Sequence, residues 1–175
     1  LNPSFHFGPA QKRCINEPVT FYDSTISFTN VAKFYWNFGD GSPIDSVNLN
    51  PVHAYTAAGN YTVIQRVIGA DGCEATNTQT VLIGSKPLPG FKMDDNCTLN
   101  TIQFTDTSFT AFGTINNWYW DFGNGQTSTS QFPTLNYNVP GDTLVKLFVR
   151  SAQGCESDTL LKTIHIFGRP VVDYN

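Results

Sequence analysis

The residues of this sequence that could do chemistry are its aspartates, its three histidines and its four cysteines. Two short stretches place an aspartate and an asparagine around a Gly-Asx-Gly turn, and the two residue types trade places between them. Asn37 and Asp40 of the first stretch correspond to Asp121 and Asn124 of the second. A general acid or base needs a titratable group at a fixed place, whereas a turn needs only an oxygen acceptor, which both residue types supply. The exchange therefore indicates hydrogen-bonding structure and argues against catalysis.

The histidines offer no repeated site either. His53 of the first half corresponds to Leu135 of the second, and His6 and His165 lie near the ends of the halves. A lone histidine between a proline and a tyrosine is more often structural than a ligand or a catalytic base. The chain also lacks a G-x-S-x-G or phosphate-binding loop motif. We therefore predict that it is not an enzyme.

The four cysteines fall two to each half of the chain. The separation in sequence between Cys14 and Cys73 is nearly the same as that between Cys97 and Cys155. This spacing favours disulfides within each half, Cys14–Cys73 and Cys97–Cys155, although four cysteines allow three pairings and the sequence does not exclude the other two. Zinc is the alternative, but there is no C-x-x-C and no histidine beside a cysteine. Disulfides predict an oxidising location outside the cytoplasm.

Each Gly-Asx-Gly turn follows a run in which aromatic residues alternate with others. Alternation with period two places the aromatic side chains on one face of a strand, and the glycines permit the positive φ of a tight turn. We therefore predict a core strand that runs into a tight loop, present twice. The residues that we assign to this structural motif are Trp36, Phe38, Gly39, Asp40, Gly41, Trp120, Phe122, Gly123, Asn124 and Gly125.

Composition bounds the class of protein. The 175 residues carry a net charge of −4, and the ten basic residues are scattered, which argues against nucleic acid as a partner. No apolar run approaches the ~20 residues of a membrane span. Short Thr, Val and Ile runs, broken by Gly, Pro, Asn and Asp, are typical of a β protein.

The two halves align with a nearly constant offset, which predicts two domains, at 1–85 and 86–168. Residues 169–175 repeat the pattern of the joint at 86–91, so we expect a linker or the first strand of a following repeat. Pro87 and Pro89 restrict the joint to extended shapes, which favours a semi-stiff connection. About seven short strands in each half predict two tandem β-sandwiches of immunoglobulin-like architecture. In the second half we expect strands at 90–93, 101–106, 115–122, 127–130, 144–150 and 158–167.

The first half resembles the PKD (polycystic kidney disease) domain. The similarity rests on Trp36-Asn37-Phe38-Gly39-Asp40-Gly41, followed by Pro51-Val52-His53-Ala54-Tyr55 and Gly59-Asn60-Tyr61-Thr62-Val63. The second half carries a diverged form of the same three motifs, in which His53 is replaced by Leu135. The arrangement of the cysteines is similar to tandem PKD repeats of large secreted or cell-surface bacterial proteins, including adhesins of gliding bacteria.

The resemblance implies an extracellular, non-enzymatic module for spacing and adhesion. Its partners would be other domains of the same long chain and a surface protein or polysaccharide. The alternative is a carbohydrate-binding accessory module of a secreted polysaccharide-active protein, with Tyr35 and Tyr119 on the outward face of the aromatic strands as sugar contacts. No cofactor is expected, with calcium at Asp94 and Asp95 as the weighed alternative to a solvated acidic turn.

Overall fold

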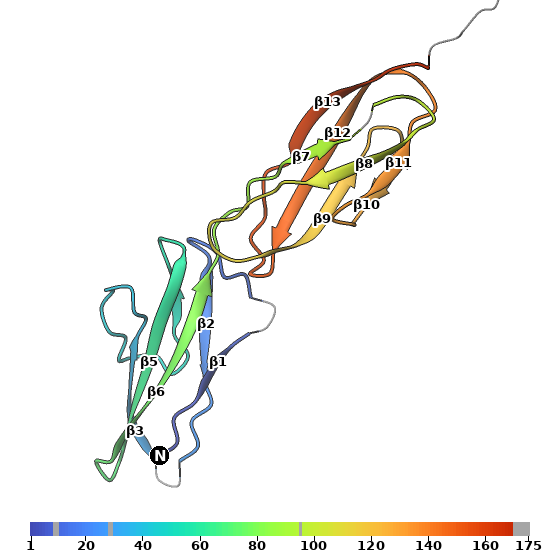
Figure 1. Ribbon diagram of the computed structural model, residues 1–175. Helices are drawn as coiled ribbons and strands as arrows, with labels where there is room; N and C mark the ends of the chain where they lie inside the picture. Colours follow the sequence, from blue (N-terminus) through green and yellow to red (C-terminus); the bar gives the residue numbers. More distant parts are fainter. Residues whose placement is uncertain (9–10, 28–29, 95, 170–175) are drawn as a thin grey trace, which may run out of the picture. The chain divides into compact units, whose positions relative to one another are not determined.

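In the computed structural model, residues 1–8, 11–27, 30–94 and 96–169 are described, and they contain strands and loops without a helix (Figure 1). The chain divides into two compact units. The first unit holds Leu1–Ser85 together with Gln153–Cys155, and the second holds the rest of the chain from Lys86 on. Within the described ranges there is no apolar helix of the length that a bilayer crossing requires.

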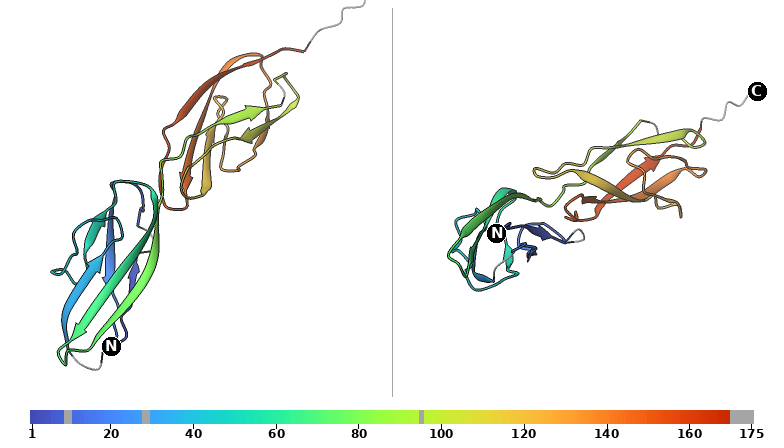
Figure 2. Two further views of the ribbon diagram at one scale, coloured as in Figure 1. Left: turned by 60° about the vertical axis from the view of Figure 1, so that its left-hand side comes forward. Right: turned by 90° about the horizontal axis from the view of Figure 1, so that it is seen from below.

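The first unit contains two three-stranded sheets, ordered β1-β2-β4 and β3-β5-β6. All of their pairings are antiparallel. The expected all-β fold is thus confirmed, with two sheets on either side of one core (Figure 2). The strands are β1 (Phe5–Phe7), β2 (Pro18–Asp23), β3 (Val31–Asn37), β4 (Val52–Ala54), β5 (Gly59–Gly69) and β6 (Glu74–Ile83).

The second unit repeats this plan with sheets ordered β11-β8-β7 and β10-β9-β12-β13. The three-residue strand β11 was not expected from the sequence; it follows Pro133 and pairs with β8. A run this short shows no alternation that would set it apart from a loop. The strands are β7 (Phe91–Met93), β8 (Thr101–Asp106), β9 (Ile115–Asp121), β10 (Thr127–Ser128), β11 (Thr134–Asn136), β12 (Gly141–Ser151) and β13 (Leu160–Ile166).

Alternating burial along the strands fills each core with aromatic and β-branched side chains. Trp36 on β3 is fully buried and packs edge-on against Phe5, with ring centroids 5.1 Å apart. Trp120 on β9 holds the corresponding place against Phe91 at 5.4 Å. Both tryptophans lie inside the protein and are surrounded by apolar side chains. They therefore serve as packing residues.

A buried tyrosine in each unit fastens the chain just after the tryptophan strand. The Tyr55 hydroxyl donates to the carbonyl oxygen of Phe38 at 3.2 Å, and the Tyr137 hydroxyl donates to that of Phe122 at 2.9 Å. Burial raises the pKa of Tyr137 to about 12 and raises the pKa of Tyr55 as well, because the charged form is poorly solvated. Both phenols are therefore neutral donors at physiological pH.

Two separate constraints, a positive φ and a close backbone contact, require glycine at the first position of each Gly-Asx-Gly turn. Gly39 has φ +78°, and a Cβ there would collide with the carbonyl oxygen of Thr62. We expect Gly39→Ala to destabilise the first unit by about 2–3 kcal/mol, through overpacking and left-handed strain. Gly41 has φ +82° but no atom within 4 Å of such a Cβ. Gly41→Ala is therefore the matched control, at about 1 kcal/mol, and equal losses in urea denaturation would contradict the steric argument.

Candidate functional site

The disulfide of this structure joins Cys14 to Cys155, with Cα atoms 5.6 Å apart. The predicted pairing within each half, Cys14–Cys73 and Cys97–Cys155, is therefore wrong. Cys155 is buried in the loop between β12 and β13, whereas Cys73 is exposed in the loop between β5 and β6. By sequence the bond links the first repeat to the second.

The strands explain why the cysteines of one repeat do not pair. Cys14 forms a parallel β-bridge with Gly84, the residue that directly follows the end of β6. Cys73 directly precedes the start of β6. The ten residues of β6 therefore separate them by roughly 30 Å, and a disulfide needs Cα atoms within about 7 Å. In the second repeat, Cys97 bridges Phe167 beyond the end of β13, and Cys155 precedes that strand. The two cysteines of a repeat thus lie at opposite ends of its last strand.

Backbone hydrogen bonds hold the segment Gln153–Cys155 within the first unit. The Arg13 N–H donates to the carbonyl oxygen of Gln153 at 2.9 Å, and the Gly84 N–H donates to that of Arg13 at 2.7 Å. A Cβ on Gly84 would lie 2.9 Å from the Cys155 sulfur, so only glycine lets the loop approach this closely. This cysteine joint, made of Cys14, Gly84 and Gln153–Cys155, is the first candidate site.

The Gly-Asx-Gly turns use amide and carboxylate for the same purpose. Asn37 Oδ1 accepts from the Gly39 N–H at 2.9 Å, and Asp121 Oδ1 accepts from the Gly123 N–H at 3.0 Å. The residue after each of these glycines accepts a hydrogen bond in the same way, but here the first repeat has the carboxylate and the second has the amide. Asp40 Oδ1 accepts from the Ser42 N–H at 3.1 Å, and Asn124 Oδ1 accepts from the Gln126 N–H at 3.0 Å. These bonds shape the loops, and either residue type can supply the oxygen that accepts them.

Asp40 also contacts His53, whose Nε2 lies 2.7 Å from its Oδ2. Burial alone would raise the pKa of the Asp40 carboxyl, but hydrogen bonds from Ser42 and His53 outweigh burial and lower it. The His53 ring stacks on Phe38 with centroids 4.1 Å apart. His53 is thus part of the turn's structure, and its replacement by Leu135 leaves the second repeat without this pair.

The lowered pKa of Asp40 makes a pH prediction. A carboxyl whose pKa is lower in the folded than in the unfolded state stabilises the fold above about pH 4 and loses that contribution as pH falls through the folded value. We expect the free energy of unfolding of the first unit to fall between about pH 5 and pH 3, and to fall less in Asp40→Asn. The measurement is urea denaturation followed by tryptophan fluorescence, with the same chain carrying Asp40→Asn as the comparison. Identical pH profiles for the two proteins would contradict it.

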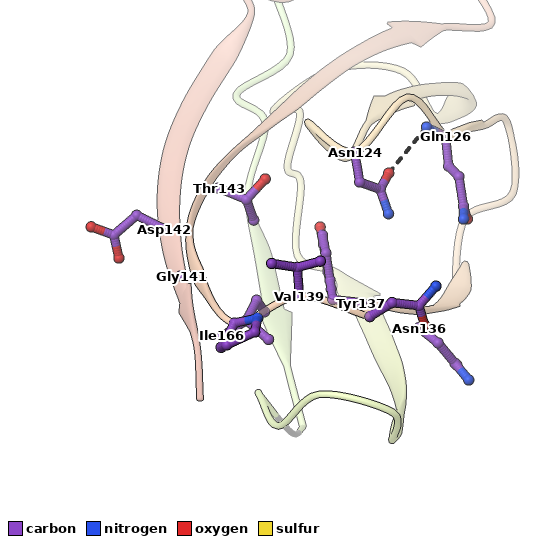
Figure 3. A pocket seen from close by; sticks show the side chains of 11 residues that line it. Asn124, Gln126, Asn136, Tyr137, Val139, Gly141, Asp142, Thr143 and Ile166 are labelled. Atoms are coloured by element: carbon purple, nitrogen blue, oxygen red, sulfur yellow. Dashed lines mark hydrogen bonds between the residues drawn. The ribbon is translucent and has the colours of Figure 1, made fainter. Parts of the chain in front are cut away.

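A polar pocket of about 360 Å³ opens in the second unit at its Gly-Asn-Gly turn. Its lining includes carboxamide, hydroxyl and ring groups, and Figure 3 shows Asn124 and Gln126 on one side of it. Asp142 points away from the others in this view and contacts His165 Nδ1 at 2.6 Å. The lining side chains are therefore mostly neutral donors and acceptors. They are Asn124, Gln126, Asn136, Tyr137, Asn138, Val139, Pro140, Asp142, Thr143 and Ile166.

One difference between the repeats lies in the lining of this pocket. Thr143 stands where the first repeat has Tyr61. The Tyr61 ring packs over Tyr55 with centroids 4.3 Å apart, and its hydroxyl donates to the carbonyl oxygen of Ala57 at 2.9 Å. A threonine is too short to cover Tyr137 in that way. The sequence prediction missed this site, and the signal was the large-to-small exchange at an aligned position.

The two tyrosines predicted to contact sugar carry arginines on their rings. The Arg66 guanidinium lies 5.3 Å from the Tyr35 ring centroid, and that of Arg150 lies 6.0 Å from Tyr119. Phe148 packs beside Tyr119 at 5.4 Å, and Tyr119 is 40% exposed. The arginines occupy part of the ring surface that a sugar would need, at a distance typical of cation–π contacts. The structure brings neither tyrosine into the pocket of Figure 3.

The calcium candidates do not form a cluster in the described part of the chain. Asp94 Oδ1 accepts from the Gln103 N–H at 2.8 Å, and Asp95 lies outside the described residues. Among the residues that the structure describes, no group of three His, Cys, Asp or Glu side chains converges as a metal site would require.

The architecture defines the class of protein as tandem immunoglobulin-like β-sandwiches. Fibronectin(III)-like modules of Clostridium thermocellum CbhA share this fold at 12% identity, with a TM-score of 0.51 over 98% of this chain and 100% of theirs. The family model of the PKD domain matches residues 1–83 and again 85–166. The chain therefore belongs to the PKD family.

Individual relatives cover short parts of the chain. The pre-pro-metalloprotease PrtV of Vibrio cholerae is 41% identical over 66 residues, which are 38% of this chain and 7% of that protein. The microbial collagenase of Vibrio alginolyticus is 34% identical over 73 residues, 41% of this chain and 9% of that protein. The solved PKD1 domain of PrtV is 34% identical and covers 46% of this chain and 96% of that domain, with a TM-score of 0.42. The chain thus spans less than a tenth of the curated relatives it matches.

Proposed function

We propose that this chain is a non-enzymatic extracellular spacer and adhesion module that carries other domains of a longer protein. Membership of the PKD family supports the proposal, because relatives combine such domains with proteases and collagenases. Asn37 and Asp121 of the repeated turns accept hydrogen bonds from backbone amides, which supports a structural role for both. The disulfide supports an oxidising location at the cell surface or in the medium. We also propose the repeat boundary near residue 85.

The Cys14–Cys155 bond is the observation that carries this proposal. The bond closes a covalent loop across a sequence separation of 141 residues, which includes nearly all strands of both units. Tension applied at the two ends of the chain passes through the bond and bypasses this stretch. This property suits a module that spaces other domains under load, because unfolding of the strands within the loop adds no length.

Single-molecule stretching of the chain tests the proposal. With the bond intact, unfolding should release little additional length from the stretch between the two cysteines. After reduction, or in Cys14→Ser, the same stretch should add roughly 45–50 nm, because each residue spans about 3.4 Å when extended. Release of the full length from the oxidised chain would refute load transfer through the bond.

A carbohydrate-binding module is the second candidate, and the pocket of Figure 3 favours it. Carboxamides and hydroxyls are groups that can recognise the hydroxyls of a sugar. Thr143→Tyr should close the pocket, since tyrosine fills this position in the first repeat. Saturable binding on a glycan array that is lost in Thr143→Tyr would establish the pocket as the site. Loss in a Tyr35→Ala, Tyr119→Ala double variant instead would place it on the strand faces, and no binding at all would leave the spacer role alone.

A further inference from the structure

The disulfide uses one cysteine of each repeat and leaves one cysteine of each repeat outside it. The four cysteines fall into two types according to where they lie relative to the last strand of their repeat. One type, the strand-end cysteine, lies beside the residue that follows the last strand; it is Cys14 in the first repeat and Cys97 in the second. The other, the hairpin cysteine, precedes the last strand; it is Cys73 in the first and Cys155 in the second. The observed bond joins a strand-end cysteine to the hairpin cysteine of the following repeat.

The backbone around Cys97 matches the backbone around Cys14. Cys14 forms a parallel bridge with Gly84, and Cys97 forms one with Phe167, the residue at the aligned position of the second repeat. The Gly84 N–H donates to the carbonyl oxygen of Arg13, and the Phe167 N–H donates to that of Asn96, both at 2.7 Å. We call this backbone arrangement the platform of the strand-end cysteine. It holds Cys14 next to its partner, and it is present a second time around Cys97.

The turn that carries Cys73 matches the turn that carries Cys155. Gly72 and Gly154 directly precede the two cysteines, with φ +80° and +82°. Cys73 is exposed on this turn, and its N–H donates to Asp71 Oδ1 at 3.1 Å. The same loop shape buries Cys155 against its partner in the structure. Cys73 therefore presents a hairpin that is already formed for the same kind of bond.

We propose that Cys73 forms a disulfide with the strand-end cysteine of another repeat of this kind, and that Cys97 of a second copy of this chain is such a cysteine. The same reaction would join consecutive pairs of repeats within one polypeptide. The two thiols lose two protons and two electrons as the S–S bond forms, and a disulfide oxidant such as oxidised glutathione takes them up and becomes two thiols. The inference goes beyond the spacer role and does not depend on any ligand of the chain.

One difference at the second platform changes the fit of the joint. Gly84 allows the Cys155 loop to approach closely, and the aligned residue of the second repeat is Phe167. A side chain there requires the incoming hairpin to be displaced by a few tenths of an ångström or more. Disulfides accept Cα separations of about 4.4–6.8 Å, and the observed joint has 5.6 Å. The Cys97 joint is therefore expected to be looser than the Cys14 joint and easier to reduce.

The test uses the full chain as the variants Cys73→Ser and Cys97→Ser, both of which keep Cys14 and Cys155. Each variant alone, and an equimolar mixture of the two variants, is incubated with oxidised and reduced glutathione. The products are analysed by non-reducing electrophoresis and peptide mass mapping. The mixture should form a dimer linked through Cys73 and Cys97, at least tenfold more than either variant alone. Wild type should form a ladder that a reductant collapses.

A second experiment removes the dependence on collision between separate chains. In it, two full copies are joined head to tail in one polypeptide. This raises the effective concentration of the two thiols to the millimolar range. A bond between Cys97 of the first copy and Cys73 of the second supports the proposal, as does the mixed dimer. Dimers that form equally well from each variant alone, or the absence of the Cys73–Cys97 peptide in both experiments, would overturn it.

Discussion

Trp120→Ala should lower the free energy of unfolding of the second unit by about 3–5 kcal/mol, a large part of the stability of a small domain. The indole is 2% exposed. Its ring packs against Phe104 and Phe122, with centroids 5.9 and 5.8 Å away. Its Nε1–H also donates to the carbonyl oxygen of Ser130 at 2.9 Å. Truncation removes these contacts and leaves a cavity between the two sheets. Urea denaturation with circular dichroism measures the loss.

Tyr119→Ala on the outward face of the same strand is the matched control, with an expected loss below about 1 kcal/mol. Trp36→Ala should act on the first unit as Trp120→Ala acts on the second. The two tryptophans should differ when replaced by Phe. Trp36 Nε1 has no acceptor among the described residues, so Trp36→Phe should cost less than Trp120→Phe. Similar losses for Tyr119→Ala and Trp120→Ala would refute the assignment of the core face.

Cys14→Ser should lower the free energy of unfolding by about 4–5 kcal/mol, summed over the transitions of the two units. In the chain-entropy model the gain from a cross-link grows with the loop that it closes, and the two cysteines here have a sequence separation of 141. Tryptophan fluorescence follows the transitions of both units together, since Trp36 lies in the first unit and Trp118 and Trp120 lie in the second. Denaturation with and without a reductant gives the same comparison in the wild type.

Cys73→Ser is the control for this measurement, because Cys73 is exposed and forms no disulfide in the structure. It should leave the unfolding transitions of the monomer within about 0.5 kcal/mol of wild type. Cys155→Ser should match Cys14→Ser, since either change removes the same bond. A loss in Cys73→Ser as large as that in Cys14→Ser would instead support the pairing Cys14–Cys73 within the first repeat.

Much of the fold could be predicted because its strands are amphipathic. Alternation along β8 places Ile102 and Phe104 on one face of the strand, and both are fully buried. The strand β11 escaped because three residues next to a proline carry no period. The pocket could not be predicted from periodicity, because it depends on which side chain covers Tyr137. That coverage is decided by packing between loops. Only the comparison of Tyr61 with Thr143 points to it in the sequence.

The disulfide could not be assigned from spacing alone. Nearly equal separations are expected for any pair of aligned positions in a true repeat, whether or not the two positions meet in space. The useful information was the place of each cysteine relative to the last strand of its repeat. Cys73 precedes that strand and Cys14 bridges the residue after it. Positions at opposite ends of one strand are too far apart to bond.

The covalent loop closed by Cys14 and Cys155 has a consequence for damage to the chain. A protease that cuts a single surface loop, such as the one between β3 and β4 or between β8 and β9, leaves two fragments that are still tied together by the sulfur bridge. Whatever the chain carries at its two ends therefore remains attached after such a nick. Outside the cell, where hydrolytic enzymes are abundant and no new copy of a broken strand can be made, this tolerance of cleavage would prolong the working life of the protein.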